Sequence, residues 1–409
     1  MTTVRIGATE HPLDDVQENP GRYARYLERA KTTQGFAECG CIMRSPRPKL
    51  VIRRYSGTFL LARWPEQAHL HAAGCRFHQT TGGPEKKGTE LDAFRQRNGH
   101  HDVRLDLSLS VSTRSPAKPA VTKTPSTSSR AQRRSAGLLA FLEYTWEAAG
   151  LNVWPGHGGR GWNVCWSQLT TELADCRING KRGDTFLHVM ERWDPTRKTE
   201  ILAEIEAFQV RLKPTADTSP RGLVIGEIEE HGPTQYGGKV VLRQSKQAYF
   251  MSAALYERLL RSYALPLSGL GKPDQRCVAI LAIERSRSNY LTIVDAAAML
   301  TNRQFLPCDS GHEVAMADFL IGLRRVFRKP VRHVGRAAVH PDFVLTDTAP
   351  ETVIEVLGLS GDPDYDARIA EKRRHYAATV TPYIEWDARV DDLRLVRIPP
   401  ANGRRELDL

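Results

Sequence analysis

The chain has 409 residues and is 41% apolar, so it can bury two or three cores of ordinary size. Its formal net charge of +11 favours a polyanionic partner, either nucleic acid such as DNA or acidic lipid. No apolar run approaches the length of a membrane span and the N-terminus lacks a signal-peptide pattern, so we expect a cytoplasmic protein that has no membrane partner.

Residues 1–112 are predicted to form an N-terminal β unit. The segment "KLVIRRYSGTFLLARWP", residues 49–65, predicts a β-hairpin that turns at Ser56 and Gly57. Residues 103–112 alternate apolar and polar side chains, which predicts the last strand of the unit. Its expected apolar face consists of Leu105, Leu107, Leu109 and Val111.

Thiols and imidazoles lie at both ends of this hairpin, which would bring the two half-sites together. Structural zinc sites favour such a donor set, with three cysteines and one histidine in a tetrahedron. The spacing leaves His69 and His78 as rival ligands, and no nucleophile or base accompanies the cluster, so we predict structural zinc. The expected ligands are Cys39, Cys41, His71 and Cys75.

Residues 113–135 contain basic but no acidic side chains and almost nothing that could pack in a core, which predicts a flexible basic linker. Residues 136–303 are predicted to be a central mixed α/β region without a clear functional motif. The expected elements are helices at 135–150, 198–212 and 253–265, a hairpin over 222–244, and strands at 277–284 and 290–300.

Two glycine-rich segments resemble nucleotide-binding loops only superficially. "GHGGRG", residues 156–161, follows Trp154 and Pro155 rather than a recognisable strand, and no βαβ unit surrounds it. In "SGLGKPD", Lys272 is followed by Pro273 where a P-loop has Ser or Thr. We therefore predict no nucleotide cofactor.

Residues 304–409 have a more regular order. Short apolar, β-branched segments alternate with helical ones in an αβββαβ pattern with a further edge strand, which predicts a three-layer α/β domain. The chain as a whole is thus expected to be an α+β multidomain protein. The C-terminal elements are helices at 312–327 and 364–378 and strands at 329–334, 341–347, 352–359, 382–388 and 393–398.

Glu355 lies inside one of these apolar strands. A buried carboxylate needs a cation or hydrogen-bonding partner, because burying it unpaired costs several kcal/mol. Asp342 begins the preceding strand, so both carboxylates can reach one end of the sheet. Two such groups suit Mg²⁺, and Glu313 on the preceding helix is a candidate third ligand.

This arrangement resembles the PD-(D/E)XK nuclease fold, in which an Asp, a Glu and a Lys two residues after the Glu form the site. In this sequence Leu357 stands at that lysine position. Some branches of the fold supply the lysine from the following helix, and Lys372 is the candidate here. It shares one helical face with Tyr365, Arg368 and Tyr376.

The resemblance implies an Mg²⁺-dependent nuclease with Asp342, Glu355, Lys372 and Glu313 in the site. Arg368 and Arg373 are candidate phosphate contacts. An alternative treats Asp342 as a turn residue and Glu355 as the partner of Arg368 or Lys372 in an ion pair. The protein would then be an inactive DNA-binding accessory protein that retains a nuclease-like scaffold.

Most of the chain also resembles an uncharacterised bacterial family, the domain-of-unknown-function family 1173. The similarity rests on "CGC…ARWPEQAHLHAAGC", "GLLAFLEYTWEAAGLNVW", "FLPCDSGHEVAMADFL", "HPDFVLTD" and "IEVLGL". The family implies a context on mobile elements or plasmids and brings no established activity.

Overall fold

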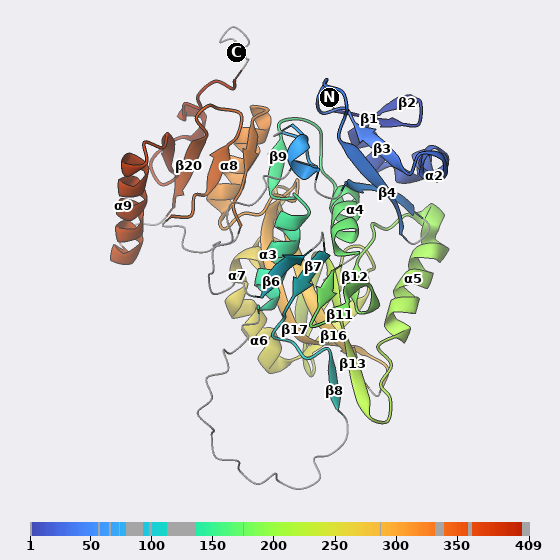
Figure 1. Ribbon diagram of the computed structural model, residues 1–409. Coiled ribbons are helices and arrows are strands. Elements are labelled where there is room, and N and C mark those ends of the chain that lie inside the picture. The colour runs from blue at the N-terminus through green and yellow to red at the C-terminus, as the bar shows by residue number, and fades with distance from the viewer. Residues whose placement is uncertain are drawn as a thin grey trace, which may run out of the picture.

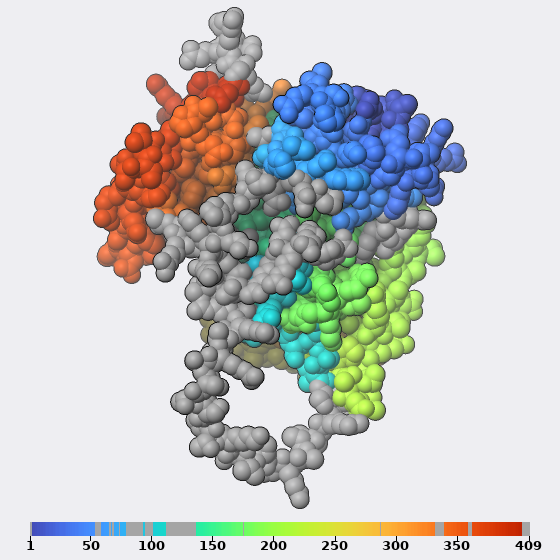
Figure 2. Space-filling model, in the orientation of Figure 1, coloured from blue at the N-terminus to red at the C-terminus, as the bar shows by residue number. Residues whose placement is uncertain are grey.

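In the computed structural model the described residues form a mixed α/β fold with four β-sheets (Figure 1). The predicted linker 113–135 and the Ser56–Gly57 turn lie outside the residues that it describes. In the space-filling view the blue N-terminal and the orange-to-red C-terminal regions lie side by side above the green and yellow central region (Figure 2). The described residues are 2–55, 58–64, 67–72, 74–78, 93–97, 100–112, 136–174, 176–286, 288–331, 339–358 and 362–402.

The N-terminal sheet has five strands in the order β2-β1-β3-β4-β5. The predicted hairpin is confirmed, because β4 and β5 pair antiparallel. Helix α2 covers the sheet, and Leu27, Leu50 and Val4 are among the residues of their common core. The elements are β1 (Thr3–Ile6), β2 (Thr9–Pro12), α1 (Leu13–Glu18), α2 (Ala24–Thr33), β3 (Phe36–Cys39), β4 (Lys49–Tyr55) and β5 (Thr58–Arg63).

The predicted continuous strand 103–112 is wrong. Between its two ends the backbone hydrogen-bonds to the side chain of Asn179 instead of forming a continuous strand pairing. The Asn179 side chain accepts from the Leu105 amide at 2.9 Å and donates to the Leu107 carbonyl at 2.9 Å. The two ends then join different sheets, both containing strands from beyond residue 135. The strands concerned are β6 (Phe94–Arg97), β7 (His100–Val103), β8 (Ser110–Ser112), β10 (Arg177–Ile178) and β11 (Lys181–Arg182).

Five strands of the central region close into a ring. Strand β13 pairs with both β14 and β16, β15 joins β14 to β17, and β17 pairs with β16. The predicted hairpin, strand pair and helices are present, whereas the closure of the ring was not predicted. The elements are β12 (Leu187–Val189), α5 (Lys198–Val210), β13 (Thr218–Thr234), β14 (Gly237–Leu242), β15 (Ala248–Ser252), α6 (Ala253–Ser262), α7 (Ala264–Ser268), β16 (Gln275–Arg285) and β17 (Leu291–Asn302).

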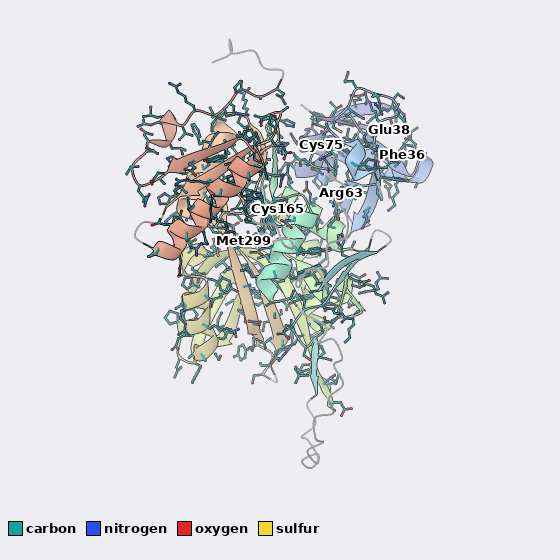
Figure 3. All side chains as sticks on the ribbon, turned by 60° about the vertical axis from the view of Figure 1, so that its left-hand side comes forward. Phe36, Glu38, Arg63, Cys75, Cys165 and Met299 are labelled. Carbon is teal, nitrogen blue, oxygen red and sulfur yellow. The ribbon has the colours of Figure 1, made fainter. Side chains whose placement is uncertain are left out.

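The barrel has an apolar interior and one covered outer face. Val240, Tyr249 and Leu281 belong to the interior cluster, which also includes side chains of α5 and α6. The outer sides of β16 and β17 pack against α3 (Leu138–Ala148), and this core extends to α4 (Trp162–Leu173). Cys165 of α4 and Met299 of β17 belong to it and lie near the centre of the molecule in Figure 3.

The C-terminal sheet has the order β21-β20-β19-β18-β9. Strands β18, β19 and β20 form an antiparallel meander, and β21 returns parallel to β20. Helix α8 packs on the face that includes Ile354 and Val356, whereas Tyr376 of α9 packs with Val353 on the other. The elements are β9 (Val153–Pro155), α8 (Gly311–Gly322), β18 (Val326–Arg328), β19 (Phe343–Leu345), β20 (Thr352–Leu357), α9 (Pro363–Ala378) and β21 (Tyr383–Asp387).

Two predicted C-terminal strands are wrong. Helix α8 ends at Gly322 instead of continuing to 327, since Arg324 takes a φ of 55°, and the chain enters β18 before the predicted strand 329–334. Residues 332–334 of that prediction lie outside the described part of the chain. The predicted edge strand 393–398 begins instead as a short 3-10 helix capped by Asp392. The 3-10 helices are η1 (Pro20–Tyr23), η2 (Ala68–Leu70), η3 (Gly183–Thr185), η4 (Pro195–Arg197) and η5 (Leu393–Leu395).

Candidate functional site

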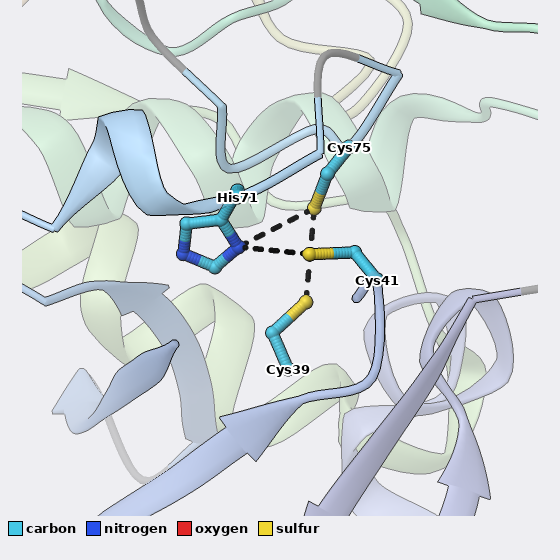
Figure 4. A group of neighbouring side chains, drawn as sticks. All are labelled: Cys39, Cys41, His71 and Cys75. Atoms are coloured by element: carbon cyan, nitrogen blue, oxygen red, sulfur yellow. Dashed lines mark hydrogen bonds between the residues drawn. The ribbon is translucent and has the colours of Figure 1, made fainter. Parts of the chain in front are cut away.

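Three cysteines and one histidine converge in the N-terminal unit (Figure 4). Cys39 ends β3, Cys41 follows it, and His71 and Cys75 come after β5 and η2. The Sγ atoms of Cys39 and Cys75 are 3.7 Å apart, and the Nδ1 atom of His71 lies 3.4 Å from Cys41 Sγ and 3.5 Å from Cys75 Sγ. One ligand atom from each residue lies within 4.8 Å of the others, so the hairpin joins the two half-sites.

The surroundings separate these four residues from the rival histidines. His69 is exposed, and His78 hydrogen-bonds through Nδ1 to the backbone carbonyl of His71 at 2.8 Å. The backbone N–H of Ala72 donates to Cys41 Sγ at 3.4 Å, an outer contact that orients a sulfur ligand. Neither His69 nor His78 belongs to the converging group.

The donor chemistry of the group fits zinc. Hydrogen bonding with Cys41 raises the pKa of Cys39 to about 12, while the Cys39 and Cys75 thiols hold the pKa of Cys41 well below its ordinary value. The Cys41 thiolate is therefore stabilised by hydrogen bonds from the Cys39 and Cys75 thiols. A cation that binds three thiolates replaces those protons, so these four residues could hold a zinc ion.

The buried Glu355 has its partners on the helix that follows its strand. Glu355 lies on β20 with 1% of its surface exposed. Its Oε2 accepts from Lys372 Nζ at 2.5 Å, and its Oε1 accepts from the hydroxyl of Tyr376. Both partners lie on α9, as the predicted helical face requires. The structure therefore contains the Glu355–Lys372 ion pair of the alternative interpretation.

Asp342 lies beside this pair. Its Oδ1 is 3.9 Å from Lys372 Nζ, and its Oδ2 accepts from the backbone N–H of Val356 at 2.7 Å. Burial and the negative charge of Asp342 raise the pKa of Glu355 to about 7, although Lys372 and Tyr376 oppose the shift. One ammonium group thus lies near both carboxylates.

Glu313 has a different partner. The Nζ atom of Lys329, a residue only 1% exposed, lies 2.7 Å from Glu313 Oε2 and 2.7 Å from Asp309 Oδ2. Burial raises the pKa of Glu313 to about 7 despite Lys329. Lys329 and Asp309 were missed from the sequence, because a lysine before a proline and an aspartate before a helix are ordinary features.

The three carboxylates do not converge on one point. Within the described residues, the Cys39–Cys75 cluster is the only group of three or more metal-binding side chains close enough to share an ion. Asp342 and Glu355 share Lys372, whereas Glu313 contacts Lys329, so the geometry leaves Glu313 outside the pair. Asp342 still influences Glu313 electrostatically.

The two candidate phosphate contacts lie on α9 but not at Glu355. Arg368 is exposed, with its guanidinium 5.8 Å from the ring centroid of Tyr365. Arg373 donates two hydrogen bonds of 2.7 Å to the carboxylate of Glu385. The predicted pairing of Glu355 with Arg368 is not seen among the described contacts.

The glycine loop 156–161 does follow a strand, β9, and precedes α4, which corrects the sequence interpretation. Its surroundings nevertheless disfavour a phosphate. The backbone N–H of Gly161, the N-cap of α4, donates to Glu18 Oε1 at 3.2 Å. A Cβ at Gly158 would come within 2.6 Å of Asp14 Oδ2. Acidic side chains therefore occupy the place where a phosphate would bind.

Fold and site together define a mixed α/β protein with a Cys₃His cluster and a separate buried carboxylate pair. Residues 14–388 match the model of the family described as "Protein of unknown function (DUF1173)", and the chain belongs to this family. No curated protein and no solved structure matches it. In the described part of the chain, every helix is too short or too polar to cross a membrane.

Proposed function

We propose that the protein is an Mg²⁺-dependent nuclease that hydrolyses DNA phosphodiesters. The observation that carries the proposal is the convergence of Asp342, which directly precedes β19, with Glu355 of β20 and Lys372 of α9. Active sites collect charged groups whose pKa values are shifted by burial and by each other. Glu355 has both features.

The order of the C-terminal elements supports the proposal. A helix, a three-stranded meander, a second helix and a strand parallel to the third follow one another from α8 to β21. This order resembles the PD-(D/E)XK nuclease fold, with Asp342 before the second strand and Glu355 on the third. Leu357 is buried at the usual lysine position, and Lys372 supplies an ammonium group from α9.

Asp342 and Glu355 would hold the ion, because paired carboxylate oxygens suit Mg²⁺. When bound, Mg²⁺ supplies charge neutralisation at the phosphate and acidifies a water molecule. The chain's own residues fix the carboxylates: the Val356 N–H orients Asp342, and Tyr376 orients Glu355. Lys372 already places one positive charge between them. Its ammonium group would therefore be displaced when the ion binds, or would move to the substrate.

The remaining features fit supporting roles within this proposal. The Cys₃His cluster would stabilise the N-terminal unit, since a structural zinc site contributes directly to folding free energy. The net charge of +11 would attract the DNA backbone, with Arg368 exposed on α9 as a phosphate contact. A mobile element or plasmid is the proposed genetic context, and the cytoplasm the proposed location.

A second candidate is a non-catalytic DNA-binding accessory protein. The observation that favours it is the complete satisfaction of Glu355 by Lys372 and Tyr376. A carboxylate whose two oxygens are both bonded needs no ion, and Leu357 leaves the usual lysine position apolar. The two candidates agree on DNA and differ on cleavage.

Cleavage of a panel of single-stranded, double-stranded and branched DNA with and without Mg²⁺ tests the proposal. Glu355→Gln removes the charge that would bind the ion while keeping the size of the side chain. Glu351→Gln is the matched control, because Glu351 is an exposed carboxylate next to the same strand. We expect Mg²⁺-dependent cleavage by the wild type and by the control only. Absence of cleavage across the whole panel would favour the accessory protein.

A further inference from the structure

The closed barrel of the central region has a specific strand connectivity. The barrel strands one to five are β13, β14, β15, β16 and β17. Strand β13 pairs with β14 and β16, and β15 pairs with β14 and, in parallel, with β17. Two helices, α6 and α7, connect the third and fourth strands. This is the connectivity of OB-fold barrels, whose second and third strands and adjoining loops bind oligonucleotides or oligosaccharides.

The described residues leave the outer face of those two strands exposed. Side chains of β14 and β15 alternate between the barrel interior and the outside, with Val240, Tyr249 and Met251 inside. Lys239 on β14, Phe250 on β15 and Thr292 on β17 are register neighbours across three adjacent strands. A cation, an aromatic ring and a hydroxyl therefore form a row on the outer face, whereas α3 covers the outside of β16 and β17.

Aromatic side chains on this face are exposed instead of buried. Phe250 is 38% exposed and Tyr290, in the loop between β16 and β17, is 61% exposed. Their ring centroids lie 6.1 Å apart with an interplanar angle of 82°. Tyr236, at the turn between β13 and β14, is 84% exposed. Folding gains little from rings left in water, so a stacking ligand would give them a role.

The charges around these rings suit an anionic chain. Lys239 Nζ lies 2.7 Å from Glu230 Oε1, and this ion pair is solvent-exposed, so a phosphate can compete for the ammonium at small cost. Arg285, at the end of β16, donates to Asn289 Oδ1 at 2.5 Å and to Gln209 Oε1 at 3.1 Å. Both acceptors are neutral amides, so they hold the guanidinium at the β16–β17 loop without neutralising its charge.

We propose that this face, defined by Tyr236, Lys239, Phe250 and Tyr290, with Arg285 at its edge in the β16–β17 loop, binds single-stranded nucleic acid. Unpaired bases would stack on Phe250 and Tyr290, and phosphates would contact Lys239 and Arg285, the combination by which OB barrels bind single strands. Duplex DNA offers its bases only within the stack, so it binds this face more weakly. The face shares no residue with the carboxylate pair and its role does not depend on the proposed nuclease activity.

Fluorescence anisotropy of a labelled oligothymidylate, without added Mg²⁺, tests the proposal on the full chain. We expect Phe250→Ala and Tyr290→Ala each to weaken binding by about 5- to 100-fold, because stacking contributes at that level per base. Tyr26→Ala is the matched control: Tyr26 is an exposed tyrosine of α2 whose ring contacts that of His11. The control should bind like the wild type, and a self-complementary duplex should compete poorly.

Three further binding measurements distinguish the possible outcomes: a Phe250→Leu variant, an oligouridylate and a neutral oligosaccharide. Phe250→Leu preserves the apolar bulk but lacks a ring, so it should bind weakly while the protein melts at an unchanged temperature. An oligouridylate arm assigns the face to RNA or DNA, and either result supports the proposal. Wild-type protein that ignores both single strands, variants that bind like the wild type, or equal loss with Tyr26→Ala would overturn it. Binding of a neutral oligosaccharide instead would assign the face to another ligand.

Discussion

The Cys₃His cluster and the carboxylate pair both bring ionisable side chains together, but they differ in whether the protein supplies the counter-charge. Each gathers ionisable side chains from segments far apart in the sequence and largely buries them. The carboxylate pair includes its own cation, Lys372, and a hydroxyl donor, Tyr376. Among the described contacts, the thiol cluster has no lysine or arginine partner, and it consists only of metal-ligating groups.

This difference distinguishes the structural role that we propose for zinc from the catalytic role that we propose for Mg²⁺. A cluster without an internal counter-charge needs an external ion to collect three thiolates. A carboxylate pair with an internal ammonium folds without an ion and can exchange the ammonium for one. We therefore expect zinc to be required for folding and Mg²⁺ to be required only for activity.

Loss of zinc gives the largest predicted effect. His71→Ala or Cys75→Ser should unfold the N-terminal unit, because zinc binding contributes on the order of 10 kcal/mol in structural sites. Limited proteolysis should then cut within residues 2–78, while the central and C-terminal regions stay protected. His69→Ala is the matched control, since His69 is exposed and outside the cluster.

Metal analysis checks the premise independently. Protein purified without chelators should carry close to one equivalent of zinc, and both variants should carry none. A wild type that contains no zinc and yet resists proteolysis would refute the structural role.

Breaking the internal ion pair gives the next largest effect. Glu355→Ala removes the 2.5 Å partner of Lys372 and leaves it only Asp342 at 3.9 Å in a mostly buried site, which should lower the free energy of unfolding by about 3 to 5 kcal/mol. Glu385→Ala is a matched control, because Glu385 is the register partner of Glu355 and pairs with Arg373, also on α9. That pair is half-exposed, so its loss should cost about 0 to 1 kcal/mol. Denaturant unfolding measures the stability of both variants. Equal losses in the free energy of unfolding would contradict the view that Lys372 is the buried counter-charge of the carboxylate pair.

Glu172, a largely buried carboxylate, extends the comparison to an ion pair for which we propose no metal role. Burial opposes the charge of Glu172, but Arg63 at 2.7 Å and His101 at 3.2 Å lower its pKa to about 2. The folded state therefore binds this proton more weakly than the unfolded chain. The resulting stability is present above the unfolded pKa of about 4.3 and disappears as the pH falls towards 2.

Glu172→Gln should lose about 2 to 3 kcal/mol at neutral pH and less in acid. Thermal melts across this range, compared with those of the wild type, measure the change. An undiminished acid dependence in the variant would show that Glu172 is not the titrating group.

The smallest predicted effect concerns competition between Lys372 and Mg²⁺. Lys372→Met removes a cation that lies 2.5 Å from Glu355 and 3.9 Å from Asp342, so Mg²⁺ affinity should rise, by roughly tenfold or less. Isothermal titration calorimetry in the absence of DNA measures it. Weaker Mg²⁺ binding in the variant would mean that Lys372 supports the ion rather than replacing it.

Local sequence patterns predicted most elements and the four-residue thiol cluster. Hairpin β4–β5 and helix α3 follow from periodicity, and the hairpin joins the two halves of the cluster. The patterns failed where tertiary contacts decide. Asn179 interrupts the predicted strand 103–112 from a distant loop, and barrel closure depends on pairing between β13 and β16. Lys329 was missed because only the folded chain places it beside Glu313.

The most direct test of the proposed Mg²⁺ site is DNA cleavage by Asp342→Asn. Asp342 is 3.9 Å from Lys372, outside hydrogen-bonding distance, and an asparagine oxygen can still accept from the Val356 N–H. The variant should therefore melt like the wild type and retain zinc. We predict that Mg²⁺-dependent cleavage falls by about 100-fold or more, since the ion loses one of two charged ligands. A folded Asp342→Asn protein that cleaves DNA at the wild-type rate would contradict the account.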